Sequence, residues 1–252
     1  NDAVLTFTPP NTANVKVNYP SLGMDFIADA DGRYTLNGTP YNDLSSFLTA
    51  TGGSFTRASI GTYFDSTGTL QTAAANTPRF DYDPVTHQPE GILIEESRTN
   101  IRTYSDQLDN AVWTRTNSSV SPNVAISPNG TLSADKLVEG TSSGVHCIGS
   151  WPSPYSNLTT YQQSVFVKAG ERTKIALHSL GVNNTSYDLG YFDLSNGTKI
   201  SGQGSISSLG NGWFRVTASI TTGNPSTSPG LRVYILDNAG NTSYVGDGSS
   251  GI

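Results

Sequence analysis

The sequence predicts an all-β protein: a jelly-roll-like β-sandwich preceded by a smaller β-rich module. Short runs of alternating or continuous apolar residues recur along the chain, and turn pairs such as Asn-Gly and Asp-Gly separate them. Asn and Gly tolerate the positive φ that tight hairpins need. Short strands with such turns between them are typical of sandwiches and barrels.

The predicted strands are Val15–Val17, Phe55–Arg57, Thr62–Phe64, Gly91–Ile94, Gln162–Lys168, Lys174–Ser179, Tyr187–Asp193, Trp213–Ile220 and Leu231–Asp237. The turn pairs are Asp31-Gly32, Asn37-Gly38, Thr67-Gly68, Asn129-Gly130, Asn196-Gly197, Asn211-Gly212 and Asp247-Gly248. Two short helices are also predicted, at Asp43–Leu48 and at Ser105–Trp113. The second has a Ser that can cap it and apolar residues that share one face.

Composition excludes several classes of function. The chain has 252 residues, enough for a sizeable core, and only 13% of them are charged. The formal net charge of −6, with no basic stripe, argues against a nucleic-acid partner. We find no apolar stretch of membrane-spanning length and no signal peptide, so membrane insertion is not expected.

Cysteine and histidine give no sign of a metal or a cofactor. The single cysteine, Cys147, excludes an intrachain disulfide and a cysteine-based zinc site. It lies in an alternating run, which predicts a small buried side chain with His146 on the opposite face of the strand. The three histidines lie far apart in the sequence, at His87, His146 and His178. We therefore predict no metal site and no cofactor.

The acidic residues do not predict catalysis. Glu95 and Glu96 are neighbours, so in a strand they face opposite sides and cannot flank one glycosidic bond. We expect one of them to pair with an arginine, such as Arg98 or Arg57, and to brace the loop. More broadly, the arginines Arg57, Arg79 and Arg98 are expected to form bracing pairs with Asp65, Asp81, Glu95 and Glu96.

Two other acidic patterns are better explained as turns. Asp81 and Asp83 would share a strand face, but Asp83-Pro84 is typical of a turn start. Asp29–Gly32 resembles the start of a calcium loop, yet the distal Glu that completes such a loop is missing. The nucleophile-elbow and phosphate-loop motifs are also missing. No catalytic residue is predicted.

The stretch from Ser54 to Asn100 carries the most specific pattern in the chain. It contains Thr56–Ser59, Tyr63–Asp65, Ala73–Asn76, Pro78–Pro84, Gly91–Glu96 and Arg98–Asn100 in that order. This pattern resembles a segment that recurs in tail fibres, tailspikes and head fibres of bacteriophages. There it precedes a carbohydrate-binding-like β-sandwich.

The rest of the chain resembles the jelly-roll modules that accompany phage fibres and are related to carbohydrate-binding modules. The matching stretches are Asp109–Thr114, Pro128–Leu137, Tyr161–Gly170 and Gly212–Val216. Such modules close with a strand that continues further than this sequence does. We therefore expect the last strand to be incomplete at Ile252, or to be completed by further sequence or a neighbouring chain.

These patterns suggest three parts. Residues 1–50 form an N-terminal connector or assembly segment, expected to order against another subunit or virion protein. Residues 51–103 form the phage-fibre β module, and residues 104–252 the carbohydrate-binding-like sandwich. The resemblance implies a virion component on the tail or capsid surface, working as a homotrimer. Its expected partners are other virion proteins and a host cell-surface polysaccharide.

Sugar rings stack on aromatic side chains, and polar neighbours bond their hydroxyls. On this basis the candidate glycan-binding residues are Trp151, Tyr155, Asn183, Asn184, Tyr187, Asn241 and Tyr244. Trp151 is either a lid over one end of the sandwich or a sugar-stacking residue. Trp113 and Trp213 match positions of the resemblance that suggest core packing.

Two other functions remain open from the sequence. The first alternative is a purely structural connector that fastens a fibre to the virion. A polysaccharide depolymerase is the second alternative, although enzymes of that kind usually show long parallel β-helix repeats, and no such repeat is present.

Overall fold

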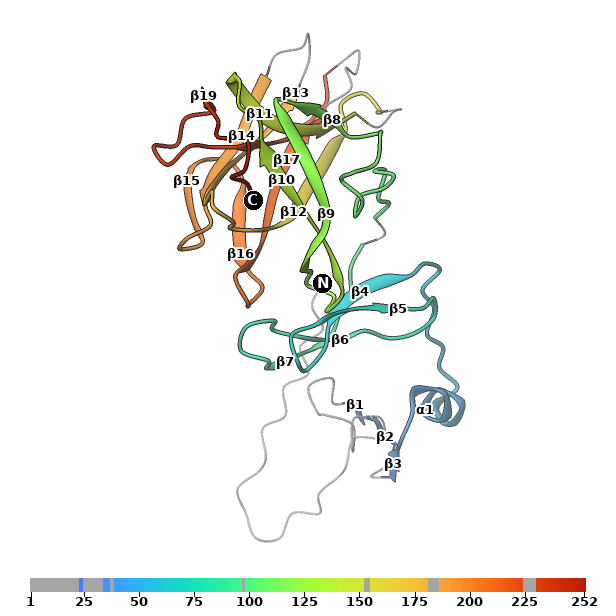
Figure 1. Ribbon diagram of the computed structural model, residues 1–252. Helices are drawn as coiled ribbons and strands as arrows, with labels where there is room; N and C mark the ends of the chain where they lie inside the picture. The colour runs from blue at the N-terminus through green and yellow to red at the C-terminus, as the bar shows by residue number, and fades with distance from the viewer. Residues whose placement is uncertain are drawn as a thin grey trace, which may run out of the picture.

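The computed structural model describes residues 23–24, 34–36, 39–96, 98–151, 155–180, 186–223 and 230–252. The predicted strand Val15–Val17 and the predicted turns at Asp29–Gly32 and Asn37-Gly38 lie outside these residues. The described chain is almost entirely β, as predicted, and forms three parts that follow one another from bottom to top in Figure 1.

A β-sandwich makes up the largest part. Its large antiparallel sheet contains β8 (Thr114–Thr116), β11 (Ser143–Ser150), β13 (Lys174–Leu180), β14 (Ser186–Asp193), β15 (Thr198–Gly202), β18 (Leu231–Ile235) and β19 (Ser243–Val245). The spatial order is β15-β14-β13-β18-β11, and both β8 and β19 pair with β11. The facing strands are β12 (Thr160–Lys168), β17 (Trp213–Thr221) and β16 (Ser205–Ser208), accompanied by the hairpin of β9 (Ser118–Ile126) and β10 (Leu132–Glu139).

Strands that are distant in sequence are neighbours in this sandwich. Both β11 and β13 pair with β18, and β12 pairs with β17 along its whole length. Such crossover pairing is what jelly rolls have and simple meanders lack.

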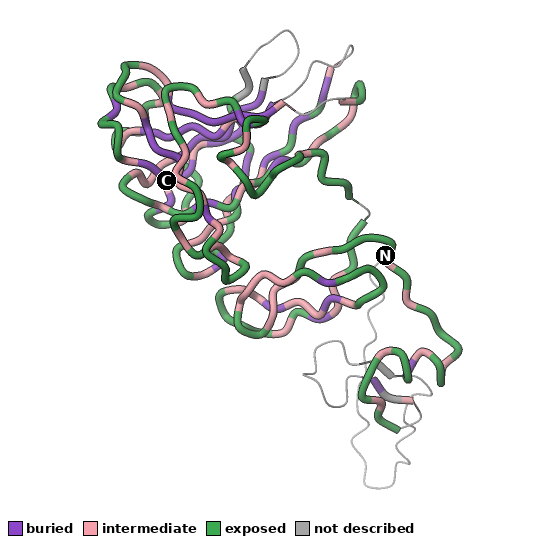
Figure 2. The backbone as a smooth tube through the Cα atoms, turned by 45° about the vertical axis from the view of Figure 1, so that its right-hand side comes forward, coloured by how far each residue is buried: buried purple, intermediate pink, exposed green. Residues whose placement is uncertain are grey.

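Alternating side chains from the two layers fill the core. In the large sheet these include Ile148, Ile175 and Ile235, which are at most 1% exposed. Val216 and Ala218 of β17 meet them from the other layer. Figure 2 shows that buried residues concentrate in the strands of the sandwich. Burial of apolar surface from two sheets is therefore the main source of stability.

Two hairpins form the middle part: β4 (Gly61–Phe64) with β5 (Leu70–Ala73), and β6 (Phe80–Tyr82) with β7 (Pro89–Ile92). The Leu70 amide donates to the Pro128 carbonyl at 2.9 Å, which ties β5 to the turn between β9 and β10.

The predicted arginine braces are present in part. Arg79 is buried, contacts Glu95 at 2.7 Å and donates to the Thr62 carbonyl at 3.0 Å. Arg57 bonds carbonyl oxygens, among them that of Thr77 at 2.9 Å, rather than a carboxylate. Arg98 pairs with Glu96 at 2.8 Å, but both side chains are about 80% exposed, so this pair lies on the surface.

The N-terminal part contains β1 (Gly23–Met24), β2 (Tyr34–Leu36), β3 (Thr39–Tyr41) and α1 (Leu44–Thr51). The helix is confirmed near its predicted position, with Asp43 as N-cap accepting from the Ser46 amide at 2.8 Å. Phe47 is 1% exposed and contacts Tyr34, whose ring also meets Phe80 of β6 at 6.2 Å. These rings form a small aromatic core that the N-terminal part shares with β6.

The helix predicted at Ser105–Trp113 is wrong, because turns occupy this stretch. Tyr104 has a positive φ of 52°, and the Trp113 indole N–H donates to its carbonyl at 2.9 Å. The Leu108 amide donates to Asp135 at 2.8 Å. A bond within the turns and a bond to β10 therefore replace the helical ones. The strand predicted at Phe55–Arg57 is also wrong, and the chain there is irregular.

Two tryptophans were predicted in the core, and one is. Trp113 is 4% exposed and packs in the sandwich. Trp213 is only half-buried, because it begins β17 on the side away from the core, where its indole N–H donates to the Ile126 carbonyl at 3.0 Å. The core prediction for Trp213 is therefore wrong.

At the C-terminal end, residues 250–252 lie antiparallel to β10. The Leu137 amide donates to the Ile252 carbonyl at 2.9 Å and the Ile252 amide donates back at 3.1 Å. The Glu139 amide donates to Ser250 at 2.9 Å. The final residues therefore contribute a short stretch of strand pairing to the sandwich.

Candidate functional site

The outer face of the large sheet carries two rows of aromatic and ionisable side chains. Strand register fixes the first row: Asp188 of β14 lies opposite His178 of β13, which lies opposite Arg232 of β18. In the second row, Tyr191 and Tyr234 flank Ala176. Together with Trp151, which follows β11, we call Asp188, His178, Arg232, Tyr191 and Tyr234 the outer-face cluster.

Hydrogen bonds and ring contacts hold the middle of this cluster. The His178 ring lies 4.3 Å from the Tyr234 ring, and its Nδ1 is 3.1 Å from an Asp188 oxygen. The Tyr191 hydroxyl donates to Asp188 at 3.3 Å. Burial lowers the pKa of His178, and although Asp188 opposes this effect, Arg232 adds to it. The imidazole is therefore mostly neutral at pH 7.

Trp151 covers one end of the cluster, on a surface made by two glycines. A Cβ at Gly230 would lie 2.2 Å from the indole nitrogen, and a Cβ at Gly149 would lie 3.0 Å from the ring. The Arg232 guanidinium lies 5.1 Å from the ring centroid. Trp151 is half-buried, so one part of the ring packs on the sheet and another part stays accessible.

Tyr155 lies beside a second arginine near the same strand end. Arg102 donates to the Ser150 carbonyl at 2.9 Å, next to Trp151 in the chain. The Tyr155 ring meets the Tyr161 ring edge-on at 4.7 Å. Burial raises the pKa of Tyr155, and Arg102 opposes this shift. Tyr155 is thus a half-buried neutral phenol.

The other predicted glycan-binding residues do not join the cluster. Asn241 is exposed in the turn before β19, where its amide groups donate to Asp237. The Tyr244 hydroxyl donates to buried Glu139 at 2.7 Å, so this ring belongs to an internal network. Tyr244 lies opposite Gly144, near the end of β11 farthest from Trp151.

Two predicted residues, Asn183 and Asn184, lie outside the described residues. The backbone of Tyr187 lies in β14 opposite Ser179, and its side chain is likewise outside the description.

Sequence reasoning missed most of the cluster. His178, Arg232 and Tyr234 lie in strands that were predicted correctly, but only register shows that they adjoin. One signal was present: the β18 positions that alternate with the residues of the main sandwich core are Arg232 and Tyr234. Tyr234 is 6% exposed and packs in a second buried cluster with Cys147 and Ala176.

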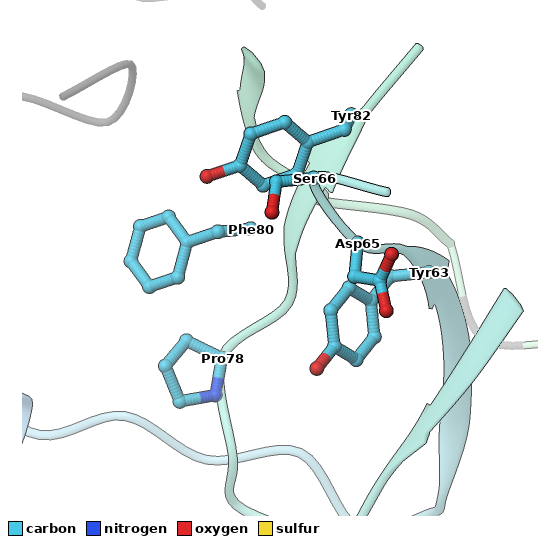
Figure 3. Close-up of a pocket in the computed structure, with 6 residues that line it drawn as sticks. All are labelled: Tyr63, Asp65, Ser66, Pro78, Phe80 and Tyr82. Atoms are coloured by element: carbon cyan, nitrogen blue, oxygen red, sulfur yellow. The ribbon is translucent and has the colours of Figure 1, made fainter. Parts of the chain in front are cut away.

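A separate pocket of about 230 Å³ lies in the middle part of the chain. Its lining residues are Tyr63, Asp65, Ser66, Pro78, Phe80 and Tyr82. Figure 3 shows the rings of Phe80 and Pro78 across the gap from Tyr63 and Asp65. Burial acts to raise the pKa of Asp65, but hydrogen bonds from Thr67, Thr69 and Gln71 outweigh it and keep the pKa low. This carboxylate is suited to bracing a turn, not to donating a proton.

The carboxylates of Asp81 and Asp83 likewise accept hydrogen bonds from the backbone. Asp81 accepts from the Phe64 amide at 2.7 Å. Asp83 accepts from Thr86 at 2.6 Å and Val85 at 2.9 Å, and these bonds lower its pKa. Asp83 therefore begins a turn, as predicted.

The described residues include no group of three or more His, Cys, Asp or Glu side chains placed to hold a metal ion. In the same part of the chain, no helix is long and apolar enough to cross a membrane. Cys147 is 3% exposed, as predicted for a small buried side chain, and burial raises the pKa of its thiol.

Compared with protein-family models, the chain matches none, and a search of curated proteins found no match. The functional argument therefore depends on the residues and geometry described above.

Proposed function

We propose that this chain is a non-catalytic component of a bacteriophage fibre or spike that binds a glycan on the host surface. Two lines support the proposal: the resemblance of residues 54–100 and 110–252 to phage-fibre and carbohydrate-binding sequences, and the outer-face cluster.

The cluster is the observation that carries the proposal. It combines a half-exposed tryptophan, which offers a flat face to a sugar ring, with Asp188 and Arg232, which offer an acceptor and donors for hydroxyl groups. Asp188 and Arg232 stand on strands of one sheet, so little conformational entropy is lost when a ligand binds to them.

In this proposal the chain works as a homotrimer attached to other virion proteins. A single shallow site on a sheet binds weakly. Several copies on one particle raise the overall strength of attachment, because later contacts become intramolecular.

The test compares two tryptophans with different surroundings. Trp151→Ala removes the stacking ring of the cluster, whereas Trp213→Ala removes a half-buried ring on the opposite layer. Losing one stacking ring costs about 1 kcal/mol, or roughly fivefold in affinity. We expect Trp151→Ala alone to weaken binding to a glycan array and phage adsorption.

Circular dichroism and thermal melting establish that each variant is folded before binding is compared. If a folded Trp151→Ala chain binds glycans as the wild type does, the outer-face cluster is not the site. A binding loss of equal size in Trp213→Ala would contradict the assignment as well.

A structural connector is the second candidate, because the hairpin of β9 and β10 exposes apolar side chains. Val124, Ile126 and Leu132 are each more than half exposed. A chain that binds no glycan, but loses virion incorporation when these residues become Ser, would favour the connector. The depolymerase has no comparable support; release of reducing ends from host polysaccharide would be its signature.

A further inference from the structure

Arg232 is an arginine on the candidate binding face without a carboxylate partner in the described part of the chain. The ion pairs found there involve other cations: Arg79 with Glu95 and Arg172 with Glu139 are examples. The acid nearest in the cluster, Asp188, already contacts His178 and Tyr191.

The neighbouring segments outside the description cannot supply an acid either. Residues 152–154 follow Trp151, residues 181–185 join β13 to β14, and residues 224–229 precede Gly230. These three segments contain no Asp or Glu in the sequence. The positive charge beside Trp151 is therefore not balanced by the loops that adjoin it.

The Arg232 side chain is held in place by its surroundings. Its stem lies over Gly149, where an added Cβ would come within 2.9 Å of the arginine Cγ. The guanidinium packs against the Trp151 ring, and its Nη1 is 3.4 Å from the Tyr234 hydroxyl. A guanidinium has five N–H donors in a rigid fork. Among the described residues, only the Tyr234 hydroxyl is an acceptor for this fork.

We propose that the outer-face cluster selects saccharides that carry a carboxylate, such as a hexuronic acid, with Arg232 binding the carboxylate and Trp151 stacking on the sugar ring. This inference rests on the proposed glycan-binding function and names the class of sugar. A planar carboxylate matches the guanidinium fork through two parallel hydrogen bonds, and the adjacent ring shields these bonds from water.

Asp188 at the other side of the cluster sets the direction of the ligand. β13 lies between β14 and β18, so Asp188 and Arg232 stand on backbones about 10 Å apart. A carboxylate placed near Asp188 would be repelled, whereas a hydroxyl there can donate to it. The acidic sugar therefore lies at the Arg232 side and a neutral part of the chain at the Asp188 side.

The test uses a glycan array printed with matched pairs. Oligosaccharides of glucuronic, galacturonic, mannuronic and N-acetylneuraminic acid stand beside the same oligosaccharides after carboxyl reduction, which keeps the ring and removes the charge. We expect the full wild-type chain to bind at least one acidic member about 10- to 100-fold more strongly than its reduced form.

Three variants locate the effect. Arg232→Leu is expected to abolish the preference, and Arg232→Lys to retain part of it, since Lys keeps the charge but not the fork. Arg215→Leu is the matched control: Arg215 also packs against an aromatic ring, Phe166 at 6.0 Å, but on the outer side of β17. It should leave the preference unchanged.

The possible failures are distinguishable. Equal binding of acidic and reduced members, or a preference that survives in a folded Arg232→Leu chain, overturns this inference and leaves glycan binding standing. Absence of binding to acidic, reduced and neutral saccharides alike counts against the proposed function itself. The comparison of each pair uses the unaltered chain, so it decides the matter even where Arg232→Leu does not fold.

Discussion

Arg172 and Glu139 form a buried ion pair that joins the C-terminal residues to the sandwich. The Glu139 side chain is 0% exposed and that of Arg172 is 16% exposed. The guanidinium donates to both carboxylate oxygens, at 2.8 and 2.6 Å. The Tyr244 hydroxyl and the Asp247 amide donate to the same carboxylate, at 2.7 and 2.9 Å.

Arg172→Ala is expected to lower the free energy of unfolding by about 3–5 kcal/mol, because it leaves a buried carboxylate without its cation. For a domain of this size the melting temperature should fall by roughly 6–20 °C. Arg98→Ala is the matched control, since its pair with Glu96 is about 80% exposed. It should cost less than about 1 kcal/mol. Urea unfolding of both variants measures the difference.

The pH dependence of stability provides a second test of the Arg172→Ala substitution. In the wild type, burial acts to raise the pKa of Glu139, but the bonds from Arg172, Tyr244 and Asp247 outweigh it and hold the pKa below its ordinary 4.5. The ion pair therefore contributes fully above pH 4.5, and its contribution is lost as the pH falls through the folded-state pKa.

In the Arg172→Ala chain we expect burial, the largest single effect on Glu139, to outweigh the remaining bonds from Tyr244 and Asp247, so that the pKa of Glu139 rises above its unfolded value. That variant gains stability from Glu139 as the pH falls toward 4.5. The difference in free energy of unfolding between the wild type and the variant should therefore narrow between pH 7 and pH 4. Equal losses in Arg172→Ala and Arg98→Ala, or a deficit that stays constant with pH, would refute the reasoning.

Three further outcomes are expected. Trp113→Ala should cost about 3–5 kcal/mol, because Trp113 is 4% exposed in the core, while half-buried Trp213→Ala should cost clearly less in the same urea titration. The Cys147 thiol, whose pKa burial raises, should resist a thiol reagent until the chain is unfolded. A reaction as fast in the folded chain as in the unfolded chain would show that the outer face of the sheet opens. Phe47→Ala should speed proteolytic cleavage of the N-terminal part, on the N-terminal side of β4, without changing the melting temperature of the sandwich. A fall in the melting temperature of the sandwich as well would show that the two parts unfold together.

Local turn chemistry and alternation were enough to predict much of the fold. The Asn211-Gly212 pair has the two positive φ angles that a tight hairpin turn needs, at 51° and 78°. The strands β12, β13 and β17 lie where their apolar residues recur at alternate positions. Such signals are local, so a sequence contains them directly.

Distant contacts decided the elements that were mispredicted. The positions of Leu108 and Trp113 in the sequence suggested a shared face of a helix. In the structure the Trp113 ring packs in the sandwich core, and turns occupy the stretch instead of a helix. The candidate site shows the same limit: Trp151 is recognisable as a tryptophan in a proline-rich loop, but Arg232 lies 81 positions later and becomes its neighbour only when β11 pairs with β18.

The pairing of residues 250–252 with β10 has a consequence for how the chain folds during synthesis. Leu137 pairs with Ile252, so more than a hundred further residues must be translated after Leu137 before this edge of β10 is covered. Contacts so distant in sequence are slow to form, and an uncovered strand edge invites pairing with other chains. Until these C-terminal residues are made, this edge of β10 is open to pairing with a neighbouring nascent chain.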